Sequence, residues 1–195
     1  MEECCGSEHP YDSRHVRASW YPSSIKCLVI GENPGVPGSP YFYDPIPKYG
    51  ADPVEVRRYL LPALVRVHLM ESPTLEAFRE AGFLFDHAIR CQLDQAVTKV
   101  EWKLAKEFQS DRAHQAAHLK PIIDQAVKVW IMGHVARDAV THLCTSPAMI
   151  KRFKKLTPPY VENPKMFVSA YFTRFMKERQ VDEVLERFKE FFYSS

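Results

Sequence analysis

A chain of 195 residues suits one domain, and its 46% of hydrophobic residues can bury a core without disulfides or metals. The formal net charge of +2 is close to neutral, so it neither requires nor excludes a nucleic-acid partner. No apolar run approaches the ~20 residues of a membrane span, and the acidic start Met1-Glu2-Glu3 is unlike a secretory signal. We therefore expect a monomeric intracellular protein with no membrane partner, cytoplasmic in a bacterium or nuclear in a eukaryote.

The cysteines and histidines show no metal-binding pattern. The five cysteines include no CxxC pair, and none of the eight histidines has zinc-ligand spacing to a cysteine. His114 and His118 are four residues apart, but two ligands alone do not make a site. We expect no metal and no cofactor, and we expect Cys27 and Cys91 to be buried free thiols.

The hydrophobic pattern alternates between strand-like and helix-like segments. In chain order it predicts an irregular lead-in at 1–24, then one domain at 25–195 with a strand at 26–30, a long loop at 31–50, helices at 52–70 and 72–82, a strand at 83–89, a helix at 101–126, a strand at 127–132, a helix at 134–143, a strand at 166–169 and a helix at 181–192. This alternation predicts an α/β fold with three α/β/α layers around a central four-stranded parallel sheet.

Single residues predict how the helices begin, bend and end. Asp52 and Pro53 are typical of an N-cap and the first helical position, and Gly82 is typical of the end of the short second helix. Pro62 predicts a kink in the first helix, and Pro121 predicts a break in the third.

A chemistry-bearing segment lies at the carboxyl end of each predicted strand. In sheets of this kind ligands bind beyond the carboxyl ends of the strands. The segments that meet there are Gly31-Glu32-Asn33-Pro34-Gly35, Asp86-His87, Gly133-His134 and residues 170–175. The first belongs to the loop 31–50, which holds four of the seven glycines and five prolines. Long loops inside compact domains are usually functional, although an ordinary turn is the alternative for this segment alone.

The loop after the first strand resembles a known motif. Val29-Ile30-Gly31-Glu32-Asn33-Pro34-Gly35 looks like motif one of the uracil-DNA glycosylase superfamily, whose mismatch-specific and single-strand-selective branches carry Asn-Pro-Gly after a glycine. Residues 39–45 resemble the segment whose aromatic ring stacks on the target base, and residues 82–91 and 120–140 are similar to later family segments. The resemblance spans residues 26 to about 192.

The resemblance implies a DNA glycosylase. Such an enzyme hydrolyses the N-glycosidic bond of a deaminated or damaged base flipped out of DNA, uracil above all, in base excision repair. One branch of the family holds an iron–sulfur cluster, and its first pair of cysteines has the spacing CxxC. This sequence lacks those cysteines, so we expect no cluster.

Two residues receive catalytic roles from the resemblance. The family position matched by Asn33 holds the attacking water, and because an amide is not a strong base the expected role is orientation. Glu32 would supply the proton acceptor that Asn33 lacks, or it is a solvent-facing loop acid. The predicted base-binding residues are Gly31, Phe42, His87 and Tyr171. For Phe42, whose ring would stack on the base, the alternative is simple core packing.

The predicted DNA contacts combine positive charge with aromatic rings. Between residues 171 and 175 aromatic side chains surround Arg174, so a ring would wedge into the base stack while the guanidinium holds a phosphate. Residues 151–155 form the one dense basic cluster. The predicted DNA-binding residues are His134, Lys151, Arg152, Phe172 and Arg174. The alternatives are core packing for the rings and ordinary solvated surface for the basic cluster.

Two departures from the family pattern leave the base and the activity open. His87 stands where the family commonly has the Asn that reads the uracil edge, and Tyr171-Phe172-Thr173 stands where His-Pro-Ser often stabilises the leaving base. A non-catalytic binder of nucleic acid or nucleotide on the same fold is therefore the alternative. A third possibility is an unrelated small-molecule α/β enzyme, although the sequence has no Gly-x-Gly-x-x-Gly or P-loop fingerprint.

Overall fold

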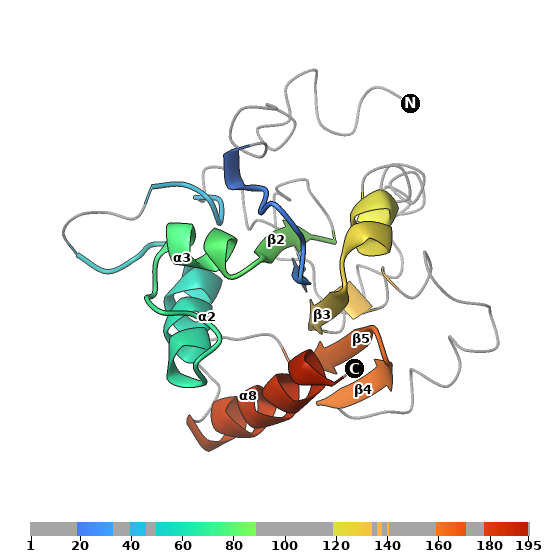
Figure 1. Ribbon diagram of the computed structural model, residues 1–195. Coiled ribbons are helices and arrows are strands. Elements are labelled where there is room, and N and C mark those ends of the chain that lie inside the picture. The colour runs from blue at the N-terminus through green and yellow to red at the C-terminus, as the bar shows by residue number, and fades with distance from the viewer. Residues whose placement is uncertain are drawn as a thin grey trace, which may run out of the picture.

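The computed structural model describes residues 19–32, 40–45, 50–88, 119–133, 136, 137, 140, 159–170 and 178–194. Four parallel strands form the centre of the sheet (Figure 1): β1 (Cys27–Gly31), β2 (Phe83–His87), β3 (Lys128–Met132) and β5 (Met166–Ser169). Their order across the sheet is β2-β1-β3-β5, so β1 is a central strand. The predicted four-stranded parallel sheet is confirmed, and each strand lies within about two residues of its predicted bounds.

A fifth strand that the sequence pattern did not predict lies at one edge. β4 (Tyr160–Asn163) pairs antiparallel with β5 and joins it through a turn at residues 164 and 165. β4 has no run of apolar residues, since Glu162 and Asn163 make up half of it, so the apolar pattern does not predict this strand. The pair Asn163-Pro164 is the sequence signal that would have indicated a turn between two short strands.

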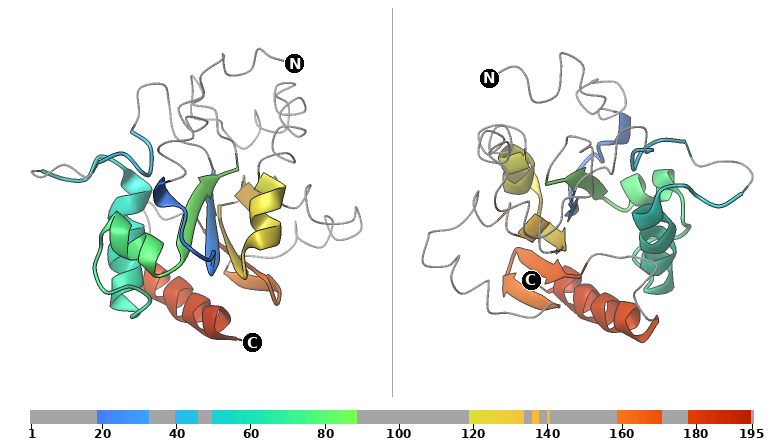
Figure 2. Two further views of the ribbon diagram at one scale, coloured as in Figure 1. Left: turned by 45° about the horizontal axis from the view of Figure 1, so that its top comes forward. Right: turned by 180° about the vertical axis from the view of Figure 1, so that it is seen from behind.

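The helices lie on both faces of the sheet, as the three-layer prediction requires. α2 (Glu55–Arg66) and α3 (Leu75–Glu80) connect β1 to β2, and the helical residues 119–125 lead into β3. The chain moves across the sheet in opposite directions in these two connections. Right-handed crossovers therefore place them on opposite faces, as Figure 2 shows. α8 (Glu178–Tyr193) contacts both α2 and β5.

α2 is shorter than predicted at both ends. It begins at Glu55, three residues after the predicted N-cap Asp52, because that carboxylate bonds the Val54 amide and the Arg57 side chain instead. The helix ends at Arg66 because His68 adopts φ +60°, with Schellman-type bonds from the His68 and Leu69 amides. Pro62 lies within α2 without ending it.

Aromatic rings fill one face of the sheet. Phe83 and Phe85 of β2, Trp130 of β3 and Phe167 of β5 are each at most 2% exposed, and the strand register places them on this face. α8 covers the face, with the ring of Phe188 stacked on Trp130 at 4.0 Å between centroids.

The structure describes one of the two predicted buried thiols and the end of the predicted lead-in. Cys27 is a buried free thiol, as predicted, and burial raises its pKa, so the sulfur is an unreactive thiol; Cys91 lies outside the described residues. At the end of the predicted lead-in, Trp20 packs on the domain through the ring of Tyr43, at 5.7 Å. Within the described ranges, no helix has the length and apolar character needed to span a membrane.

Candidate functional site

The predicted site residues that can be placed lie at the carboxyl ends of the parallel strands. Gly31 ends β1 and is paired in register with His87, which ends β2. On the other side of β1, β3 ends at Met132 and is followed by Gly133, whose amide donates to the Ser169 carbonyl at the end of β5, at 2.9 Å. The four strand ends predicted to meet at one edge therefore do so.

Gly31 allows two side chains of β2 to approach the main chain of β1. A Cβ built on Gly31 would lie 2.7 Å from Cζ of Phe85 and 3.5 Å from Cδ2 of His87. The first distance is too short for any side chain. Glycine at this position thus provides space that the Phe85 ring occupies, a packing role that the motif alone did not reveal.

His87 and Asp86 alternate between the two faces of β2. His87 is 4% exposed, lies on the same face as Phe85 and meets that ring edge-on at 4.9 Å. Asp86 pairs in register with Ile30 and points to the opposite face, and its Oδ1 accepts a hydrogen bond from the His87 amide at 2.8 Å. Only His87 of this pair is therefore directed to the face that carries Phe42.

Phe42 lies in the aromatic core next to the site. Its ring is 1% exposed and stacks face to face on Phe85, with centroids 4.1 Å apart and an interplanar angle of 9°. Phe78 of α3 contacts it at 5.4 Å. Phe42 thus has the core-packing role that was the alternative to base stacking. It also contacts Phe85, which in turn lies against Gly31. A base contact by this ring stays a prediction, because one face is already taken by Phe85.

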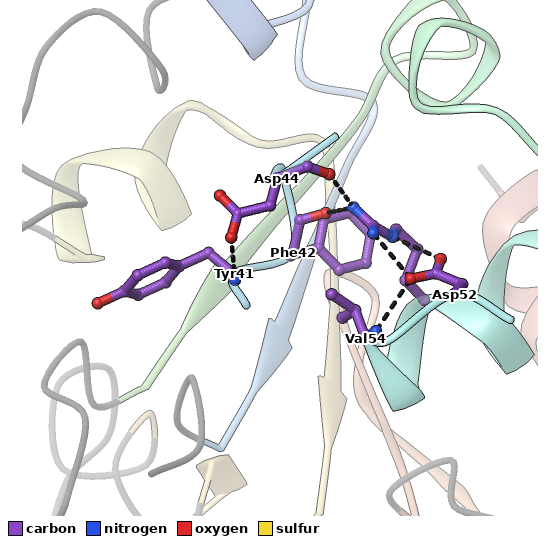
Figure 3. Close-up of polar contacts among 6 residues, drawn as sticks. Tyr41, Phe42, Asp44, Asp52 and Val54 are labelled. Atoms are coloured by element: carbon purple, nitrogen blue, oxygen red, sulfur yellow. Dashed lines mark hydrogen bonds and ion pairs between the residues drawn. The ribbon is translucent and has the colours of Figure 1, made fainter. Parts of the chain in front are cut away.

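A buried ion pair that the sequence did not indicate holds the segment 40–45. The Arg57 side chain has no exposed surface; its Nε and Nη2 donate to the two carboxylate oxygens of Asp52 at 2.7 Å each. Its Nη1 donates to the carbonyl oxygens of Phe42, at 2.6 Å, and Asp44 (Figure 3). Asp52 and Arg57 are five positions apart in the sequence, a spacing that no helical pairing rule covers.

Electrostatics favour the ionised form of Asp52. Partial burial alone would raise the pKa of this carboxyl, but the hydrogen bonds from Arg57 and from the Val54 amide, together with the charges of Arg57 and Arg58, outweigh burial and leave the pKa below its ordinary value. The ion pair is therefore formed at neutral pH.

Tyr43 ties the same segment to the free edge of β2. Its hydroxyl donates to the carbonyl of Phe85 at 3.1 Å and accepts from the amide of Phe85 at 2.6 Å. The hydroxyl thus satisfies both backbone groups of an edge-strand residue, where a neighbouring strand would otherwise do so. Asp44 closes a turn in this segment by accepting from the Tyr41 amide at 2.8 Å.

Glu32 reaches across the edge of the sheet from β1 to the end of β3. It is half-buried, and a Cβ built on Gly133 would lie 2.5 Å from its Oε1. Gly133 also has φ +88°, a conformation that favours glycine. The carboxylate therefore lies against the Gly133 main chain at the strand ends, where it is only partly exposed to solvent.

The other predicted site residues lie outside the described residues. They are Asn33, His134, Lys151, Arg152, Tyr171, Phe172 and Arg174. Among the residues that are described, no three His, Cys, Asp or Glu side chains gather as metal ligands would.

Comparison with known proteins does not place the chain in a family. No family model matches the sequence, and no curated protein sequence matches it either. Any function must therefore be inferred from the residues and from their geometry.

Proposed function

We propose that this chain is a monofunctional DNA glycosylase that hydrolyses the N-glycosidic bond of a deaminated or damaged base flipped out of DNA. The observation that carries the proposal is the position of Gly31: the motif starts at the end of the central strand, at the edge where parallel sheets bind ligands. There Gly31 and His87 both touch Phe85, on which Phe42 stacks. Three of the four predicted base-binding residues thus share one line of contacts.

The proposed reaction needs only water as co-substrate. The bond between the sugar C1′ and the base nitrogen breaks, the hydroxyl of water joins C1′, and the departing base takes up a proton. Asn33 orients the water through its amide. Glu32 accepts the proton of the water and releases it to solvent, from which the departing base takes up its proton. The half-buried position against Gly133 keeps the carboxylate at the strand ends.

Base preference is assigned to His87. Its place at the end of β2, next to Gly31, is where the resemblance puts the amide that reads uracil. A neutral imidazole offers one donor and one acceptor on separate nitrogens, whereas an amide offers both side by side. We propose uracil as the first candidate substrate, with hypoxanthine and xanthine as the deaminated purines to compare.

An excision screen tests the proposal. Oligonucleotides carrying one uracil, hypoxanthine or xanthine, single-stranded and double-stranded, are incubated with the protein and treated with alkali to cut abasic sites. We expect cleavage with at least one base, loss of cleavage in Asn33→Ala with DNA binding kept, and retention in Asn33→Asp, which still holds a water. Absence of cleavage with every base, by protein shown to be folded, would falsify the proposal.

His87→Asn sharpens the same screen. We expect it to raise uracil excision relative to hypoxanthine excision by about tenfold, since a site built for an amide edge discriminates by roughly 1–3 kcal/mol per contact. An unchanged ratio of the two rates would remove His87 from base reading.

A non-catalytic binder on the same fold is the second candidate. The specific observation in its favour is that Phe42 and His87 are only 1% and 4% exposed, which favours core packing over the stacking and reading of a flipped base that excision needs. Salt-sensitive binding of an undamaged oligonucleotide without any cleavage would support the binder. In either case, replacing any one of the predicted DNA contacts by Gln should reduce the salt dependence of DNA binding. These contacts are Lys151, Arg152 and Arg174.

A further inference from the structure

Arg57 has an unusual position for an arginine. It lies in the first turn of α2, where positive charge is not favoured by the helix dipole, and its side chain is completely buried. Its hydrogen bonds cross-link three pieces of chain: the residues before α2 through Asp52, α2 itself, and the segment 40–45 through the carbonyls of Phe42 and Asp44.

We propose that Arg57 is a positioning residue that fixes Phe42, and through it Phe85, beside Gly31 and His87. The inference rests on the proposed glycosylase function and deepens it. It adds a residue that neither the motif nor the resemblance assigns.

The contacts lead from Arg57 to the strand ends in three steps. Arg57 holds the carbonyl of Phe42 at 2.6 Å, and the ring of Phe42 lies flat on Phe85 at 4.1 Å. Cζ of Phe85 in turn occupies the space that a side chain at Gly31 would need. A shift of the segment 40–45 would therefore be passed on to the ring that touches both Gly31 and His87.

Positioning explains the ion pair better than stability does. Replacing a buried ion pair by apolar side chains is often neutral or stabilising, so such a pair is weak evidence for a stabilising role. The carbonyls of Phe42 and Asp44 belong to no helix or strand, and the fork of the guanidinium supplies donors to both at once. A lysine offers a point charge without the fork, so it cannot hold the carboxylate of Asp52 at two points while reaching both carbonyls.

The test compares Arg57→Lys with Arg58→Lys. Arg58 is the next residue of α2 and is exposed, so it controls for the general effect of the exchange. Two quantities are measured at a temperature where every variant is folded: the single-turnover excision rate on a uracil oligonucleotide (or the best substrate of the screen), and hydrogen exchange of peptides covering residues 41–45, 83–88 and 180–194. Asp52→Asn serves as a second, nearly isosteric variant if Arg57→Lys does not fold.

We expect Arg57→Lys to lower the single-turnover rate about 10- to 100-fold with nearly unchanged oligonucleotide affinity, since small displacements of a site cost that much. Exchange should become faster at 41–45 and 83–88 but not at 180–194, and Arg58→Lys should behave as wild type. A lower melting temperature with an unchanged rate per folded molecule and unchanged exchange at 41–45 would overturn the proposal. If the wild-type protein cuts nothing, the glycosylase function fails, while the exchange pattern still decides whether Arg57 fixes this segment.

Discussion

The two ends of the parallel sheet are built in different ways. At the amino ends of the strands, side chains fill the space: Lys128 is 6% exposed, its Nζ donates to the Pro164 carbonyl at 2.8 Å and to Ser194 at 3.2 Å, and it lies 4.7 Å from the Phe191 ring centre. Gly82, before β2, leaves space there for the Lys26 side chain, and at the carboxyl ends two glycines leave space for side chains at the predicted site. Gly31 admits the Phe85 ring and Gly133 admits the Glu32 carboxylate.

This difference indicates a division of labour between the two ends. The amino ends anchor the last helix to the sheet, so substitutions there should change stability and leave chemistry alone. The carboxyl ends bring side chains close to the main chain, so substitutions there should change chemistry by more than their effect on stability implies. Two predictions test this division and two more compare a buried with an exposed ion pair, in order of expected size.

The largest effect should come from Phe188→Ala, which tests the stabilising half of the comparison. Phe188 is fully buried in α8 and stacks on Trp130 at 4.0 Å, so its removal leaves a large cavity. We expect the free energy of unfolding in urea to fall by about 3–5 kcal/mol. Excision per folded molecule should stay as in wild type. A large loss of excision by fully folded protein would mean that this region also shapes the site.

The next effect should come from Gly31→Ala, which tests the other half. The added Cβ would lie 2.7 Å from Cζ of Phe85, so the ring must move, at a cost of about 1–3 kcal/mol in unfolding free energy. We expect the excision rate to fall much further than this loss of stability implies.

Two controls separate crowding from other causes in Gly31→Ala. Gly50→Ala strains a φ of +91° but meets no atom within 4 Å, so it should lose some stability and keep excision. Adding Phe85→Leu to Gly31→Ala removes the crowded Cζ, so the two substitutions should be less harmful together than the sum of their separate effects. Strict additivity would show that the close approach is not the cause.

The sheet and its topology were predictable from the sequence. The strands at 26–30, 83–89, 127–132 and 166–169 were predictable because each contains a short apolar run, and glycines mark the ends of the first and third, at Gly31 and Gly133. Their alternation with helices determines a parallel sheet. The gathering of Gly31 and His87 at one edge followed from that topology alone. The edge strand β4 and the end of α2 at His68 depend on only a few residues each, and period-based reasoning missed both.

The contacts that shape the site were not predictable from spacing. Arg57 was one charged residue among many in a helix, and nothing in its sequence distance from Phe42 or Asp52 indicates a buried ion pair. The Tyr43 hydroxyl bonds Phe85, 42 residues away. Such contacts arise only when residues 40–45 lie against β2 and α2, which a local pattern does not record.

The difference in acid between wild type and Asp52→Asn should be smaller, and it comes in addition to the cost, present at every pH, of leaving the buried Arg57 guanidinium without its carboxylate partner. The pKa of Asp52 is lowered in the folded protein, so its ionised form contributes stability above its unfolded pKa, and this contribution is lost as pH falls below about 4 toward the folded value. Asn cannot titrate. We therefore expect the melting temperature of wild type to fall more steeply with decreasing pH in this range than that of Asp52→Asn. Parallel curves for the two proteins would show that Asp52 carries no such linkage.

The smallest effect should come from Lys120→Ala, which removes an exposed ion pair, in contrast to the buried pair of Arg57 and Asp52. Nζ of Lys120 lies 2.7 Å from Oδ2 of Asp124, one helical turn away, and the two side chains are 48% and 60% exposed. The side chains of Arg57 and Asp52 are 0% and 13% exposed. Water and salt screen the exposed pair, so we expect a change of less than about 0.5 kcal/mol in unfolding free energy, vanishing in 1 M salt. The two pairs have the same length, so burial and the carbonyls that Arg57 also holds should account for any difference in their effects. A loss of more than about 1 kcal/mol in unfolding free energy for Lys120→Ala would show that charge pairing by itself stabilises this fold. Burial would then not be what distinguishes the Arg57 pair.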